Sequence, residues 1–277
     1  GLTEGLGEGV PEDADVVLVL GPDRGLLKQE VDALRAYLKR GGSLLLALEP
    51  AELRSGRPEF DTEDMMLPLL DDLGVSMGQG VLASTSMIVP TSNNVSDRMN
   101  VATDGFSSHP STVVLSKNRG QLKLFTPGAG HLAQKQDSKA KTTVTVRSHG
   151  SSWADRNMNL NLEKEQAESK TSRPLAIASE GEGENGFRAI VVADASLFAD
   201  FPIQNPGNQQ FIYDALNWLT GQEALSGGVE NEEDVKIQHT KEGQAGWFYS
   251  TVLGIPLLFL ALGAVRLRIR RRKGGEA

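Results

Sequence analysis

The chain has 277 residues, of which 39% are hydrophobic and 23% are charged, a composition typical of a folded globular protein. It contains no cysteine, which excludes disulfides, thiolate-ligated metals and a cysteine nucleophile. The net charge of −8 disfavours nucleic-acid binding, because an acidic surface repels the phosphate backbone.

The first elements along the chain predict a β-α-β unit. The apolar run 16–20 predicts a buried parallel strand, and the segment 25–42 predicts a helix because its apolar residues recur on one face. These residues are Leu27, Val31, Leu34 and Leu38. The run 43–50 predicts a second buried strand, which should lie parallel to the first through a right-handed crossover.

The middle of the chain is predicted as a β-rich insertion at about 80–150. A helix is expected at 61–75, before this insertion. Extended or β-type runs are expected at 80–90, 111–116, 120–125 and 141–148. The stretch 91–111 is predicted as a loop and 151–174 as a long surface excursion, because both are polar and poorly periodic.

The last part of the body predicts two strands within 174–198, around a turn rich in glycine and glutamate, and a helix over 208–221. Together with the first unit, these elements favour an open α/β sheet of parallel strands. The body is therefore expected to form one α/β domain over residues 1–226.

Polar side chains follow three of the predicted strands. They are Asp23, Glu49, Asp194 and Ser196, the candidate ligand-binding residues. In open α/β sheets, ligands bind beyond the carboxyl ends of the parallel strands, so the three carboxylates could form a metal or acid–base site. Helix capping is the alternative and the favoured reading, because no histidine or lysine accompanies them in a recognised spacing.

Motifs for nucleotide chemistry are missing from the sequence. No glycine-rich segment carries a GK[ST] ending or opens a helix as GxGxxG, so no nucleotide is expected to bind this chain. The four histidines have no metal-binding spacing, and neither a metal nor another cofactor is predicted. They are His109, His131, His149 and His239. Trp153 is expected to fill the edge of the core, with contact to a sugar or a partner as the alternative.

The C-terminal part of the sequence predicts a membrane anchor. An acidic connector at 227–246 leads to the uncharged segment 247–265, which is long enough to cross a bilayer as a helix. The basic tail 266–277 should stay in the cytoplasm, which leaves the body outside the inner membrane of a bacterium. Because the chain starts with glycine rather than methionine, we expect further sequence upstream.

The sequence resembles a known family. The stretch DADVVLVLGPDRGLLKQEVDALRAYLKRGGSLLLALEP is similar to the core of the gliding-motility-associated (GldG-type) auxiliary proteins of ABC transporters. Three further elements resemble the family's in the same order: His109-Pro110, SSWADRN at 151–157, and the strand–Asp–helix segment that ends in Asn217-Trp218-Leu219.

The resemblance implies a Rossmann-like fold, similar to that of the type 1 glutamine amidotransferases. It does not imply their activity, because the chain has no cysteine nucleophile. It also implies an auxiliary role beside an ABC permease and an ATPase, and it supplies no catalytic residues.

Three hypotheses follow for the function. The leading one is a non-catalytic, membrane-anchored subunit of an ABC transport system, whose outer domain binds a substrate, an envelope component or another subunit. The second is an anchored envelope hydrolase or sugar-modifying enzyme that uses the strand-end carboxylates. The third is a purely structural envelope protein.

Overall fold

The computed structural model describes residues 6–54, 66–85, 94–183 and 186–222, with the single positions 252, 253, 256, 257 and 266. The chain divides into two units, residues 1–229 and 230–277. The predicted acidic connector lies outside the described residues, as do most of the predicted membrane span and basic tail. In the part of the chain that is described, no helix is long and apolar enough to cross a bilayer.

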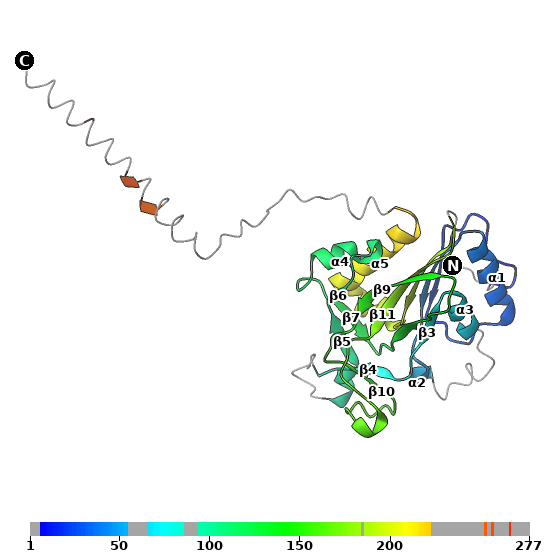
Figure 1. Ribbon diagram of the computed structural model, residues 1–277, viewed down its shortest axis with the longest axis horizontal. Coiled ribbons are helices and arrows are strands. Elements are labelled where there is room, and N and C mark those ends of the chain that lie inside the picture. Colours follow the sequence, from blue (N-terminus) through cyan, green and yellow to red (C-terminus); the bar gives the residue numbers. More distant parts are fainter. Residues whose placement is uncertain are drawn as a thin grey trace, which may run out of the picture. The chain divides into compact units, whose positions relative to one another are not determined.

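A six-stranded sheet forms the centre of the first unit, in the order β1-β2-β12-β11-β9-β6 (Figure 1). Its strands are β1 (Val16–Leu20), β2 (Ser43–Ala47), β12 (Arg188–Val192), β11 (Pro174–Glu180), β9 (Lys141–Arg147) and β6 (Gly105–Phe106). The first three are parallel, whereas β11, β9 and β6 each pair antiparallel with their neighbours.

The prediction of an all-parallel sheet is therefore wrong, and the sheet is mixed. The reason lies in the connection between β11 and β12, which is a short turn after Glu180. A turn of this length can join only antiparallel strands, because a parallel pair needs a long crossover. The structure confirms a mixed α/β fold, and the Rossmann-like classification stays a prediction.

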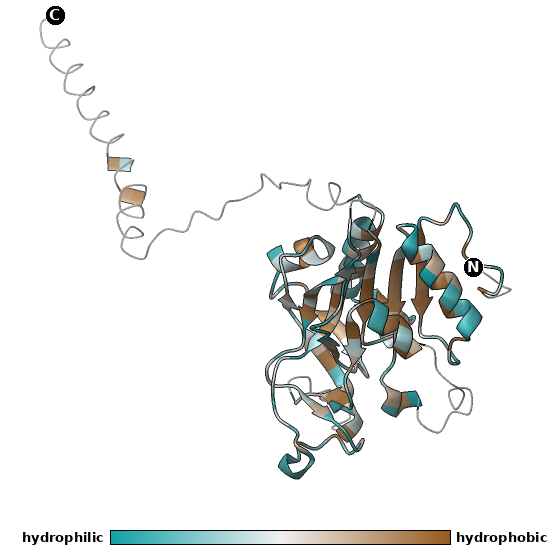
Figure 2. Ribbon diagram, turned by 45° about the vertical axis from the view of Figure 1, so that its right-hand side comes forward, coloured by the Kyte–Doolittle hydropathy of each residue, from teal (hydrophilic) through white to brown (hydrophobic). Residues whose placement is uncertain are grey.

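Helices cover both faces of the sheet (Figure 1). On one face lie α1 (Lys28–Lys39) and α3 (Met66–Asp72), and on the other lie α4 (Val113–Lys117) and α5 (Pro206–Leu219). Each face of the sheet has its own hydrophobic core, and β2 contributes to both. Leu44 and Leu46 pack in one core, while Leu45 and Ala47 pack in the other. Figure 2 shows the apolar strands between helices whose outer surfaces are hydrophilic.

The strand β1 differs from its prediction in burial. It lies parallel to β2 as expected, but it is the edge strand, with Leu18 49% and Leu20 41% exposed. The apolar run alone did not predict this exposure. Val17 and Val19 pack on the α1 side, and together with the exposed leucines they make the run continuously apolar although only one face of the strand is covered. Leu27 also differs, since α1 begins after it and leaves its side chain 54% exposed.

Three small antiparallel sheets lie between β2 and β11 along the chain, and we call them the lobe. They pair β3 (Val75–Met77) with β8 (Leu132–Gln134), β4 (Val81–Ala83) with β10 (Trp153–Asp155), and β5 (Asn100–Thr103) with β7 (Leu124–Pro127). The helix α2 (Ala51–Arg54) connects β2 to this part of the chain. The loop predictions for 91–111 and 151–174 are wrong where β5, β6 and β10 form.

The prediction of a β-type run at 111–116 is wrong as well, because this segment is helical. A 3₁₀ turn, η3 (Pro110–Thr112), leads directly into α4. The backbone amide of Val114 donates to Asp214 Oδ2 on α5 at 3.2 Å. This long-range contact outweighs the β preference of the two valines, which is a weak and context-dependent tendency.

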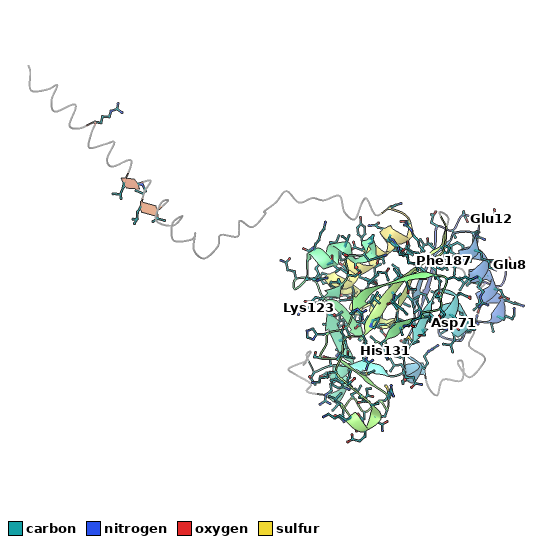
Figure 3. All side chains as sticks on the ribbon, in the orientation of Figure 1. Glu8, Glu12, Asp71, Lys123, His131 and Phe187 are labelled. Atoms are coloured by element: carbon teal, nitrogen blue, oxygen red, sulfur yellow. The ribbon has the colours of Figure 1, made fainter. Side chains whose placement is uncertain are left out.

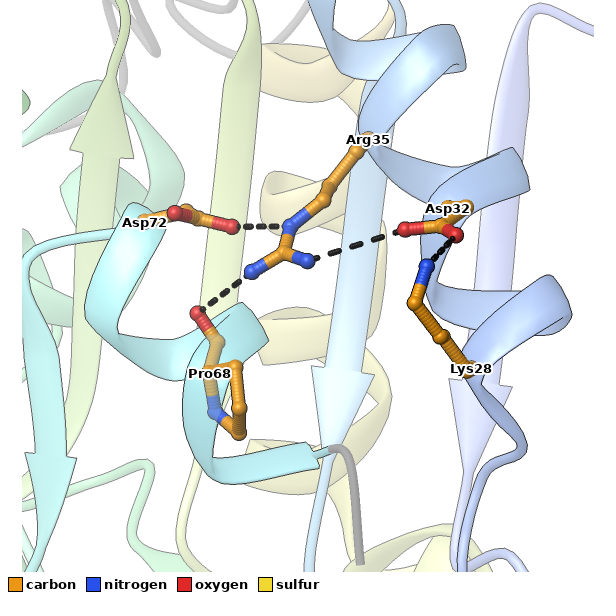
Figure 4. A network of polar contacts seen from close by, with 5 residues as sticks. All are labelled: Lys28, Asp32, Arg35, Pro68 and Asp72. Atoms are coloured by element: carbon orange, nitrogen blue, oxygen red, sulfur yellow. Dashed lines mark hydrogen bonds and ion pairs between the residues drawn. The ribbon is translucent and has the colours of Figure 1, made fainter.

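A polar network joins α1 to α3 on the outer surface (Figure 4). Arg35 pairs with Asp72, donates to the Pro68 carbonyl oxygen and approaches Asp32, which also pairs with Lys28. Each of these exposed ion pairs contributes little to the free energy of unfolding. The two helices are held mainly by the leucines beneath the network, which are fully buried.

Asn208 fixes α5 to the lobe. Its Oδ1 accepts from the Phe125 amide at 2.8 Å, while its Nδ2 donates to the carbonyl oxygens of Phe125 at 2.8 Å and Pro202 at 3.0 Å. The side chain is completely buried. Asn208 therefore satisfies both backbone hydrogen-bonding groups of Phe125 in β7.

Replacing Asn208 with alanine should lower the free energy of unfolding by about 2–3 kcal/mol, because the partly buried backbone N–H and C=O groups of Phe125 would lose their partners. Urea denaturation followed by circular dichroism measures the change. The matched control is Gln209→Ala, the exposed next residue of α5, which should change stability by less than about 0.5 kcal/mol. Equal effects of the two substitutions would contradict the anchoring role.

Candidate functional site

The carboxyl ends of β1, β2 and β12 meet at one edge of the sheet, because these three strands are adjacent and parallel. Gly21, just beyond β1, has φ +60°, and a Cβ at this position would lie 2.8 Å from the Cβ of Ala195 beyond β12. The segment that follows β12 therefore reaches the end of β1, although β2 lies between these two strands in the sheet. This edge carries all four candidate residues predicted from the sequence.

The structure brings three of the four candidates together. Ser196 Oγ donates to Glu49 Oε1 at 3.3 Å, and both residues are partly exposed. Asp194, two residues before Ser196, is only 1% exposed. Asp23 is exposed, and no contact among the described residues joins it to the other three.

Asp194 is the most perturbed carboxyl group of this edge. Burial raises its pKa well above the ordinary value of 3.8, and the charge of Glu49 adds to the effect. The backbone amides of Ser196 and Leu197 act in the opposite direction, although neither carboxylate oxygen has a hydrogen bond of standard geometry. Asp194 therefore lies enclosed just before the turn Ser196–Phe198, as a capping residue would, but no side-chain hydrogen bond caps this turn, so the capping interpretation stays a prediction.

A cluster of basic side chains lies near the same edge and was missed by the sequence analysis. It consists of His131, Arg156 and Arg173. Burial lowers the pKa of His131 to about 4, and the charges of Arg173 and Arg156 add to this effect. His131 Nδ1 and Arg173 Nε are both buried without a hydrogen-bond partner. Figure 3 shows the position of His131 between the main sheet and the lower part of the lobe.

Strand pairing explains why these side chains converge. The Gly78 amide donates to the His131 carbonyl oxygen at 2.8 Å, and Gly80 lies against the backbone of Asp155, which precedes Arg156. His131 and Arg156 therefore flank the same short turn. No local sequence signal connects them, because each belongs to a different pair of strands.

Two of the family-like sequence elements pack on each other. The ring of His109 meets the ring of Trp218 edge-on, with 4.8 Å between centroids. The guanidinium of Arg188 lies 5.3 Å from the same indole ring, and the Arg188 side chain donates to the Trp218 carbonyl oxygen at 2.6 Å. These contacts therefore join η3, α5 and β12.

The SSWADRN element also has a structural role in the lobe. Trp153 is 1% exposed and packs with Ala83 and Leu160, which confirms the prediction that it fills the edge of the core. Burial raises the pKa of Asp155, while the backbone amides of the loop that follows act to lower it. Met158 and Leu160 in that loop adopt left-handed backbone angles, with φ 63° and 59°.

An apolar surface is exposed on the α5 side of the lobe. The side chain of Phe201 is 77% exposed and contacts Phe125 edge-on at 6.5 Å between centroids. The two rings line a cavity of about 660 Å³. Its other lining residues are Asn100, Ala102, Lys123, Gln204 and Asn205. We call this the Phe201 surface.

Metal binding finds no support in the described part of the chain, where no three histidine, aspartate or glutamate side chains gather around one point. The edge instead offers a half-exposed Glu49–Ser196 pair beside a basic cluster. Such an arrangement is suited to holding polar groups of a ligand.

Replacing Asp194 with asparagine should change how stability depends on pH. The folded-state pKa is raised, so the wild-type carboxyl contributes its full stability below pH 3.8 and loses it as the pH rises toward the folded-state pKa. Relative to the wild type, Asp194→Asn should therefore become more stable as the pH rises from 4 to 8. Thermal unfolding across this range measures the difference, and parallel curves would contradict the burial argument.

For His131 we expect the opposite dependence of stability on pH. Its folded-state pKa is lowered from 6.5 to about 4, so the folded protein loses stability as the pH falls through this interval. His131→Asn should lose less stability than the wild type between pH 6.5 and 4. The same unfolding measurements provide the test, and an equal loss in both proteins would show that His131 is not enclosed.

Comparisons with known proteins agree with this architecture. Among solved structures, the chain is similar to the "mmIFT52 N-terminal domain", with a TM-score of 0.52 and 18% sequence identity. The match covers 74% of this chain and 77% of that one. At this identity the similarity concerns the fold alone. No curated protein sequence matches at a significant level.

The family comparison covers most of the chain. The family described as "ABC-type uncharacterized transport system" matches residues 2–217. The matched range runs from before β1 almost to the end of α5, and so includes both the sheet and the lobe. The chain therefore belongs to the ABC-type uncharacterized transport system family, whose members are auxiliary components of ABC-type transport systems.

Proposed function

We propose that this protein is a membrane-anchored, non-catalytic auxiliary subunit of an ABC transporter. The body formed by the sheet and the lobe would lie outside the cytoplasmic membrane and engage the permease or a ligand. The observation that carries the proposal is the family match over residues 2–217. The uncharged segment 247–265 and the basic tail support the anchoring.

The Phe201 surface is the candidate docking site for the permease subunit. A large aromatic side chain exposed beside an apolar cavity is typical of a surface that another protein covers. Asn100, Lys123, Gln204 and Asn205 line the same cavity and add polar groups to it. An apolar centre with a polar rim is the usual anatomy of a protein interface.

A catalytic role has weaker support. Asp194, the carboxyl group with the most strongly raised pKa at this edge, is enclosed, Glu49 and Ser196 are only partly exposed, and the exposed Asp23 makes no contact with them among the described residues. Membership of an auxiliary transport family also favours a role in binding rather than in chemistry.

Affinity purification of the detergent-solubilised full-length protein, followed by mass spectrometry, tests the proposal. We expect recovery of an ABC permease or ATPase. Phe201→Gln should reduce that recovery at least severalfold, because truncating an exposed aromatic anchor removes much of an interface's binding energy. It should leave thermal stability unchanged, since the side chain is 77% exposed.

Leu67→Gln is a suitable control. Leu67 is 59% exposed on α3, which covers the opposite face of the sheet. This variant should recover the transporter subunits as well as the wild type does. Absence of any permease or ATPase from the wild-type sample would argue against the proposed function. Equal losses in both variants would reject only the assignment of the Phe201 surface.

A further inference from the structure

A second cavity of about 470 Å³ lies at the β6–β9 edge of the main sheet. Its volume falls within the usual range for small-molecule sites. The lining side chains are mostly polar and include Asp104, Ser107, Arg119, Thr145, Arg147 and Ser172. The cavity exists because β6 is only two residues long, so that it leaves the neighbouring part of β9 uncovered.

Several lining groups have hydrogen-bonding capacity that the protein does not use. Within the described part of the chain, the guanidinium of Arg147 and the carboxylate of Asp104 have no side-chain partner. Arg119 uses one of its nitrogens to donate to the Phe106 carbonyl oxygen and keeps its other N–H groups available. The cavity thus has two cationic groups and one anionic group at its surface.

Thr145 provides an independent observation. The residue is 1% exposed and lines the cavity, and its hydroxyl, which solvent does not reach in the free protein, has no hydrogen-bond partner. Buried hydroxyl groups are nearly always paired, so an orphaned one at a cavity wall indicates a missing partner. The Thr145 carbonyl oxygen is already paired with the Ser107 amide at 2.8 Å, which leaves the side chain as the free group.

We propose that this cavity binds an acidic sugar of the uronate type. The planar guanidinium groups of Arg119 and Arg147 match the geometry of a carboxylate. The Thr145 hydroxyl and the Asp104 carboxylate bind hydroxyl groups of the sugar ring. A neutral sugar would leave both cations unpaired, and inorganic phosphate would be repelled by Asp104 without using the hydroxyl sites.

This inference concerns a ligand of the domain and does not depend on association with a transporter. Failure of the affinity purification would therefore leave it intact, and its own failure would leave the proposed subunit role intact.

Isothermal titration calorimetry of the full-length protein in detergent tests the assignment. The probes are sodium glucuronate, glucose as its neutral match, and inorganic phosphate. We expect one glucuronate per chain, with at least tenfold weaker binding of glucose and of phosphate. No binding of glucuronate at millimolar concentration, or phosphate binding as tight as glucuronate, would overturn the proposal.

Variants locate the binding. Arg147→Gln should weaken glucuronate binding at least tenfold, and Thr145→Val should weaken it severalfold without lowering the thermal midpoint, because the hydroxyl lacks a partner in the free protein. The matched control is Lys39→Gln, which removes the same charge from the exposed end of α1. If Lys39→Gln weakens glucuronate binding as much as Arg147→Gln does, the ligand responds only to the overall charge of the protein, and the assignment of binding to this cavity is wrong.

Discussion

The pairing of β2 with β12 is the constraint on which the rest of the structure depends. All five residues of β2 are buried, so the strand needs a partner on each side and a helical layer on each face. β1 supplies one partner from nearby in the sequence, and β12 supplies the other, with Ser43 opposite Arg188 and Ala47 opposite Val192. The Ser43 hydroxyl also donates to the Leu219 carbonyl oxygen, 176 residues further along the chain.

This pairing also determines the environment of the candidate site. Because β2 and β12 run in the same direction, Glu49 and Ser196 leave the sheet at the same edge. The lobe contacts the sheet at that edge. Just before β8, the Gly130 amide donates to the Ala193 carbonyl oxygen beyond β12 at 2.7 Å. The lobe therefore packs beside the strand ends, which explains why Asp194 is buried and His131 is partly buried although they belong to different parts of the fold.

The sequence predicted the elements whose signals are local. The apolar runs of β1 and β2, the periodicity of α1 and α5, and the pair β11–β12 were all recognisable. The short turn between β11 and β12 already implied that these two strands are antiparallel. The pairing of β9 with β11 and of β6 with β9 was not recognisable, because apolar patterning does not show which distant strands are neighbours. The helix at 111–116 depends on Asp214, a residue of α5, which no local propensity reveals.

The candidate site was likewise predicted only in part. Glu49, Asp194 and Ser196 were found because residues that follow parallel strands gather at one edge. The basic cluster and the uncovered stretch of β9 were not found, because both arise from pairings between distant segments. Asp23 was grouped with the others by the same rule, yet it points to solvent at the exposed end of β1.

The separation between Ser43 and Leu219 has a consequence for how the protein is made. Until β12 and the end of α5 have been synthesised, β2 has one unpaired edge, and its face with Leu45 and Ala47 lacks the cover that α5 provides. Contacts between such distant segments form slowly, because a long stretch of chain must first be ordered. We therefore expect the nascent protein to be prone to aggregation until these segments meet, and a chaperone that covers short apolar strands to increase the yield of folded molecules.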